Sequence, residues 1–164
     1  MNFSEEFLEN IAETDLKAAG NGRIVLISST AATMGAPAFS AYSASKAGLL
    51  GMMRSVAQDG APHGITCNSL LPGWVRSEMT ELSAAHDAEQ MGISVAEVWK
   101  QREASYAAGR TIEPDEVGNA IAFFCSKQSS GLSGEELRVA LGGRFNSLGD
   151  VNRRCYSRVC GLNL

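Results

Sequence analysis

The sequence lacks the features that would place it in a membrane or on nucleic acid. No apolar run approaches the ~18 residues of a membrane-spanning helix, and the opening residues are acidic where a secretory signal would be basic and then apolar. The formal net charge of -4 gives no general reason to expect nucleic acid or anionic lipid as a partner. We therefore expect a cytoplasmic protein that binds neither.

Cysteine and histidine are too scarce and too scattered to predict a metal site. The four cysteines form no Cys-x-x-Cys pair, and the two histidines do not cluster with them. Cys67 and Cys125 lie in apolar surroundings and are expected to be small buried hydrophobes. His63 and His86 lie in loop-like sequence and are expected on the surface. We expect no bound metal.

Three short runs, of which the first is continuously apolar, predict a parallel sheet in a chain of 164 residues, which is long enough for one domain. Each run is bounded by residues typical of turns, as in fully buried parallel strands. Helical patterns fill the intervals between the runs, so the expected class is α/β, a partial, doubly wound parallel sheet with flanking helices. The expected strands lie near residues 23–28, 64–71 and 136–141.

Helical periodicity predicts the remaining elements. Ser94, followed three residues later by Glu97, is typical of a helix start, and Pro114 with the acidic residues after it marks another. Residues 29–37 are expected to form a loop at the carboxyl end of the first strand, where open α/β sheets place their ligands. The expected helices cover residues 1–19, 41–58, 76–88, 94–107 and 114–125.

The helix near residues 41–58 carries a stripe of small residues, formed by Ala44, Gly48, Gly51 and Ser55. Each glycine in a helix interior costs roughly 1 kcal/mol relative to alanine. Small side chains let two backbones approach closely, so some close contact should offset this cost. We expect contact with a second copy of the chain, or alternatively close packing on the chain's own sheet.

Tyr42 and Lys46 have the clearest chemical use. They begin the helix near residues 41–58, and one helical turn separates them, so their side chains share a face. An ammonium beside a phenol favours the phenolate, which makes the phenol a better proton donor and acceptor near neutral pH. Ser29, at the end of the first strand, would lie within reach of the same point. An ordinary helix pair and a loop-capping serine are the structural alternatives.

These residues and the segments around them resemble the C-terminal half of a short-chain dehydrogenase/reductase. The resemblance covers residues 1–143, from about Asn2 to Gly143, and implies a Rossmann-like sheet. Residues 144–164 match nothing in the family and are expected to form a flexible tail. The resemblance rests on Gly-Arg-Ile-Val-Leu-Ile-Ser-Ser, then Tyr-Ser-Ala-Ser-Lys-Ala-Gly, then Gly-Ile-Thr-Cys-Asn, then Pro-Gly-Trp-Val-Arg-Ser-Glu-Met.

The resemblance implies an NAD(P)-dependent oxidoreductase that interconverts an alcohol and a ketone. Tyr42 would act as the general acid and base, and Ser29 would hydrogen-bond the substrate oxygen. Lys46 would favour the phenolate and hold the nicotinamide ribose, so that it and Tyr42 both contact the cofactor. Asn2 would hold a water molecule in the proton relay.

The same resemblance places the nicotinamide ring of NAD or NADP beside the turn after the second strand. Pro72 and Gly73 would let the backbone approach the ring, because glycine has no Cβ. Val75 would offer backbone groups to the carboxamide, and Ser77 would replace a frequent threonine. Residues 74–108 would form a helical lid over a small-molecule substrate, and this lid carries no charge cluster that identifies the substrate.

The family commonly pairs subunits through the helix near residues 41–58, so a homo-oligomer is expected. The chain contains no Gly-x-x-x-Gly-x-Gly turn for a pyrophosphate. The first strand would lose its inner neighbour, which would leave an unpaired apolar edge. The alternative is therefore a truncated, non-catalytic remnant that keeps the oligomerising helices but lacks useful cofactor affinity. A serine hydrolase built on Ser29 is excluded, because no Gly-x-Ser-x-Gly elbow surrounds it.

Overall fold

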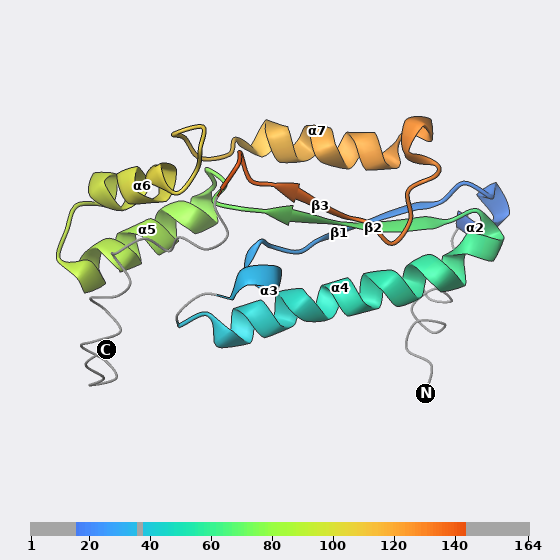
Figure 1. Ribbon diagram of the computed structural model, residues 1–164, viewed down its shortest axis with the longest axis horizontal. Coiled ribbons are helices and arrows are strands. Elements are labelled where there is room, and N and C mark those ends of the chain that lie inside the picture. The colour runs from blue at the N-terminus through green and yellow to red at the C-terminus, as the bar shows by residue number, and fades with distance from the viewer. Residues whose placement is uncertain (1–15, 36–37, 144–164) are drawn as a thin grey trace.

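A computed structural model describes residues 16–35 and 38–143 (Figure 1). Three parallel strands form one sheet in the order β1-β2-β3. This confirms the α/β class and the parallel sheet expected from the sequence. The strands are β1 (Arg23–Ile27), β2 (Thr66–Pro72) and β3 (Glu136–Val139).

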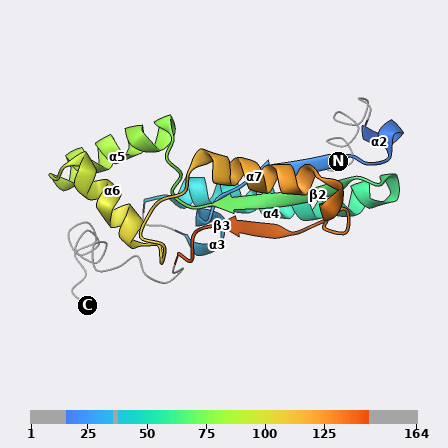
Figure 2. The same cartoon turned by 90° about the horizontal axis from the view of Figure 1, so that it is seen from above.

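The middle strand is fully enclosed even though three of its seven residues, Thr66, Asn68 and Ser69, are polar. Every residue of β2 is buried, because β1 and β3 pair with its two edges and helices lie over both faces of the sheet (Figures 1 and 2). Within the described residues β1 is paired along one edge only, and its last residue, Ile27, is 40% exposed. The unpaired apolar edge expected for the first strand is therefore present.

The helices divide into two layers and a projecting pair. Figure 1 shows α4 on one face of the sheet and α7 on the other, while α5 and α6 lie beyond the carboxyl ends of the strands. Two short 3-10 helices cover Ala61–His63 and Lys127–Ser129. The α-helices are α2 (Leu16–Ala19), α3 (Ala31–Met34), α4 (Ser40–Gly60), α5 (Glu78–Met91), α6 (Val95–Ala104) and α7 (Pro114–Cys125).

One face of α4 is buried and the face that carries the small stripe is exposed. Met53 and Val56 are fully buried against the sheet, where they pack with Cys67 and its apolar neighbours. The small stripe is exposed, and a Cβ built on Gly48 or Gly51 would meet no atom within 4 Å. Close packing of this stripe on the chain's own sheet is therefore wrong, whereas contact with a second copy stays a prediction.

Three local expectations are wrong. A single helical turn, α3, replaces part of the loop expected over residues 29–37. His86 lies within α5 and not in a loop. Cys125 is exposed at the end of α7, because Phe124 faces the sheet and the next residue turns away from it. Cys67 is buried as expected, and burial raises the pKa of its thiol to about 11.

Two expectations fall outside the described residues. Asn2 and the tail at residues 144–164 are not among them, and of the helix expected near the N-terminus only α2 is described. The roles given to Asn2 and to the tail therefore stay predictions. None of the helices in residues 16–35 and 38–143 is both long and apolar enough to cross a membrane.

Candidate functional site

Tyr42 and Lys46 lie together on the first turns of α4. The Nζ atom of Lys46 is 5.7 Å from the centroid of the Tyr42 ring, as their separation of one helical turn predicts. Phe39 packs edge-on against this ring, with 6.0 Å between the ring centroids. Tyr42 is nevertheless 42% exposed, so a ligand could reach it.

Lys46 is tied to the carboxyl end of β1. Its Nζ atom donates a hydrogen bond to the carbonyl oxygen of Ile27 at 2.9 Å. In the opposite direction, the hydroxyl of Ser28 donates to the carbonyl oxygen of Lys46 at 2.8 Å. An ammonium has three donor hydrogens, so the bond to Ile27 leaves two for a ligand.

Ser29 follows this anchored strand end directly. Its Oγ atom accepts a hydrogen bond from the backbone N–H of Ala31 at 3.2 Å, and this contact helps to start α3. Because the oxygen acts here as an acceptor, the hydroxyl hydrogen stays available for donation. The fold thus brings Tyr42 and Lys46 together and attaches them to the strand end that Ser29 follows.

The turn after β2 leaves the sheet at the same end, because all three strands are parallel. Val75 forms an isolated parallel bridge with Ile112. In this bridge, the N–H of Ile112 donates to the carbonyl oxygen of Trp74 at 3.0 Å, and the carbonyl oxygen of Ile112 accepts from the N–H of Arg76 at 2.9 Å. The carbonyl of Val75 accepts from the hydroxyl of Thr80. The N–H of Val75 has no acceptor among the described residues.

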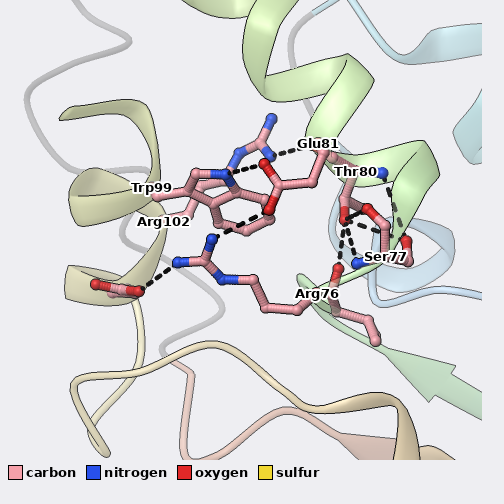
Figure 3. A network of polar contacts seen from close by, with 8 residues as sticks. Arg76, Ser77, Thr80, Glu81, Trp99 and Arg102 are labelled. Carbon is pink, nitrogen blue, oxygen red and sulfur yellow. Dashed lines mark hydrogen bonds and ion pairs between the residues drawn. The ribbon is translucent and has the colours of Figure 1, made fainter. Parts of the chain in front are cut away.

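Ser77 begins α5 as its N-cap. Its Oγ atom accepts from the backbone N–H of Thr80 at 3.4 Å, and the Thr80 hydroxyl accepts from the N–H of Ser77 at 3.0 Å (Figure 3). These reciprocal bonds form a capping box, which stabilises the helix start. Ser77 therefore has a structural role that the resemblance did not imply, and its contact with a cofactor stays a prediction.

Tyr106 is a residue of this region that sequence reasoning missed. It lies just after α6, is 8% exposed, and its hydroxyl accepts a hydrogen bond from the N–H of Trp74. A Cβ on Gly73 would overlap this hydroxyl, and one on Gly143 would lie 2.9 Å from the ring. On this side of the turn, the group whose close approach requires glycine at position 73 is the chain's own Tyr106. It is not a nicotinamide ring.

Two arginines and two tryptophans stack where this turn meets α5 and α6. The Arg76 guanidinium lies 3.9 Å from the Trp99 ring centroid, and that of Arg102 lies 3.9 Å from Trp74 and 4.8 Å from Trp99. Figure 3 shows Arg76, Trp99 and Arg102 gathered in this contact. Such cation–π contacts are stronger when they are shielded from water.

The same contact contains charges that are paired with one another. Arg102 is 6% exposed, and it pairs with Asp87 at 2.8 Å. Arg76 pairs with Glu81 at 3.1 Å and with Glu103 at 3.0 Å. These charges compensate one another. They attach the α5–α6 pair to the turn and point to no charged substrate.

A protein-family model described as enoyl-(acyl carrier protein) reductase matches residues 7–143. Among curated proteins, the diacetyl reductase ((S)-acetoin forming) of Staphylococcus aureus is 36% identical over 124 residues, which cover 76% of this chain and 48% of that protein. The 3-oxoacyl-(acyl-carrier-protein) reductase FabG of Escherichia coli is 37% identical over 119 residues, which cover 73% of this chain and 44% of that protein. The chain thus spans about half the length of these relatives.

Solved structures show the same partial match. An actinorhodin polyketide ketoreductase variant with NADPH aligns with a TM-score of 0.73 at 32% identity, covering 79% of this chain and 49% of that one. A xylitol dehydrogenase with bound NAD+ aligns with a TM-score of 0.71 at 27% identity, covering 77% of this chain and 51% of that one. These alignments confirm the partial Rossmann-like sheet expected from the sequence.

Proposed function

This chain belongs to the short-chain dehydrogenase/reductase family, and from that premise we propose that it acts as an NAD(P)-dependent oxidoreductase that interconverts an alcohol and a ketone. The observation that carries the proposal is the position of Lys46, whose Nζ atom lies 5.7 Å from the Tyr42 ring centroid while it bonds to the end of β1. A phenol and an ammonium thereby meet at the edge of the sheet where α/β folds bind ligands.

In the reducing direction, Tyr42 donates its hydroxyl proton to the carbonyl oxygen of the ketone, and that oxygen becomes the alcohol. The reduced nicotinamide, when bound, supplies the hydride for the new C–H bond. Lys46 stabilises the phenolate that the proton leaves behind. Ser29 donates a hydrogen bond to the same substrate oxygen and holds it near Tyr42.

The residues around this point fit the nicotinamide end of NAD or NADP. The N–H of Val75 has no acceptor among the described residues and would donate to the carboxamide. Lys46 has two further donors for the ribose hydroxyls. Pro72 and Gly73 shape the turn, and the exposed hydroxyl of Ser77 would add a polar contact. For the pyrophosphate, the sequence contains no Gly-x-x-x-Gly-x-Gly turn.

The rest of the proposal concerns the surroundings of this site. The α5–α6 pair lies beyond the carboxyl ends of the strands and would act as the substrate lid. The exposed small stripe of α4 would contact a second copy, and the open space at Gly48 and Gly51 supports this. A cytoplasmic location stays a prediction.

Binding and turnover of the 164-residue chain test the proposal. We expect NADH or NADPH to bind in the micromolar range, and diacetyl, the named substrate of one relative, to serve as a probe ketone. Replacing Tyr42 by Phe should lower turnover by about 100-fold or more, with an unchanged circular dichroism spectrum. The control is Gln58→Ala, which shortens an exposed side chain near the far end of the same helix, outside the small stripe. Substantial residual turnover in Tyr42→Phe would refute the assignment.

The free edge of β1 favours a second candidate function. Ile27 is 40% exposed at this edge, so the sheet as described has room for a further strand. A non-catalytic remnant would keep α4 as its oligomerising helix and lack useful affinity for nucleotide. Absence of detectable NADH and NADPH binding at millimolar concentration would favour this remnant over the oxidoreductase.

A further inference from the structure

Trp74 is the most firmly held residue of the turn after β2. Its N–H donates to the hydroxyl of Tyr106, and its carbonyl oxygen accepts from Ile112 N–H at 3.0 Å. Its ring lies 3.9 Å from the guanidinium of the buried Arg102. Both backbone groups and the side chain of Trp74 are therefore fixed by residues that are distant in sequence.

This arrangement sets the direction of the next N–H group. The carbonyl of Trp74 and the N–H of Val75 belong to one planar trans peptide, so they point in opposite directions. Because the carbonyl faces Ile112, the N–H of Val75 faces away from it, and it has no acceptor among the described residues. Any group that fixes Trp74 thus also aims this donor.

We propose that Tyr106 is a positioning residue for the cofactor. By holding the N–H of Trp74, it keeps the N–H of Val75 aimed at the carboxamide of a bound nicotinamide. The identity of the ligand rests on the proposed function, whereas the contact between Tyr106 and Trp74 does not. Burial raises the pKa of Tyr106, so its hydroxyl stays neutral and available as an acceptor across the working pH range.

The variant Tyr106→Phe removes one oxygen atom and keeps the ring that fills the space beside Gly73. We expect the dissociation constant of NADH or NADPH to rise roughly three- to tenfold, the effect of one hydrogen bond. Binding of ADP-ribose, which has no nicotinamide, should not change. Ser129→Ala is the matched control, because it removes another fully buried hydroxyl, which bonds to Phe124 O away from the turn.

Equal weakening of ADP-ribose and of the complete nucleotide would overturn the proposal, since it would mean a general loss of structure. If the unmodified chain binds the nucleotide and Tyr106→Phe binds it equally well, the proposal is also overturned. Hydrogen exchange at the Trp74 amide gives a readout without cofactor. Its protection should fall roughly three- to tenfold in Tyr106→Phe, while that of Gly73, which donates to Val139 O at 3.0 Å, should not.

The two measurements separate failure of this inference from failure of the proposed function. If the unmodified chain binds neither nucleotide, the proposed function fails, and the cofactor part of the inference fails with it. Loss of protection at Trp74 would then still support a role of Tyr106 in ordering the turn. Unchanged protection at Trp74 would overturn that role whatever the binding result.

Discussion

The close contact between Gly73 and Tyr106 predicts a strong energetic coupling between them. A Cβ on Gly73 would overlap the Tyr106 hydroxyl, while the nearest ring carbons lie 3.0 and 3.2 Å from the same point. In Gly73→Ala the tyrosine must therefore move, which costs about 1–3 kcal/mol in overpacking. The movement also breaks the bond to Trp74 N–H, which leaves a buried donor unpaired and costs about 1–3 kcal/mol more.

In Tyr106→Phe the bond to Trp74 is already lost, at the same cost of about 1–3 kcal/mol. Adding Gly73→Ala to this variant should then cost only the residual contact with the ring carbons. We therefore expect the double variant to be about 1–2 kcal/mol more stable than the sum of the single effects. Urea unfolding of the four proteins at neutral pH measures this difference in the free energy of unfolding.

Gly118→Ala, in the interior of α7, is the matched control for the glycine change. A Cβ there meets no atom within 4 Å, so the replacement should stabilise the helix by up to about 1 kcal/mol. Additivity of Gly73→Ala and Tyr106→Phe within about 0.5 kcal/mol would refute the coupling. It would mean that the glycine is needed for a reason other than Tyr106.

Two further predictions concern the charged residues. Arg102→Met should lower the free energy of unfolding by about 2–4 kcal/mol, because it removes the hydrogen bonds of a buried guanidinium to Thr80 O and Ser83 Oγ and its stacking on both tryptophans. Arg102→Lys should not restore the stacking. A loss below about 1 kcal/mol in urea unfolding would contradict this. The guanidinium of Arg110 lowers the pKa of Glu116 from 4.5 to about 2. Because the folded-state pKa is the lower one, the stabilisation is present above pH 4.5 and is lost as the pH falls toward 2. Thermal melts across this range should show Glu116→Gln converging with the unmodified chain at low pH; a constant difference would contradict the pairing.

The sequence was sufficient for features that depend on local order. The segment that follows Gly64 and ends at Pro72 predicts a strand, and the spacing of Tyr42 and Lys46 places both on one helix face. The start of α6 was also predictable, since Ser94 accepts from Glu97 N–H at 3.1 Å as a helix cap does. The expectation that Ser29 lies within reach of Tyr42 and Lys46 rests partly on the resemblance and stays a prediction.

Features that join distant segments could not be read from the sequence. The contact of Tyr106 with Gly73 depends on how α6 ends relative to the sheet, and nothing in the sequence near the tyrosine indicates it. The arginine and tryptophan residues of the stack come from the turn and from α6, so no local pattern connects them. Cys125 was misplaced because an apolar helix alone does not indicate which of its faces meets the sheet.

The stack has an optical consequence. The chain contains two tryptophans, and both lie within 5 Å of the Arg102 guanidinium, at 3.9 and 4.8 Å from their ring centroids. All indole fluorescence of the protein therefore originates at the junction between the turn and the α5–α6 pair. A shift of the tryptophan emission spectrum will report movement of that pair. Rearrangements confined to α7 or to the far end of α4 will leave the emission unchanged.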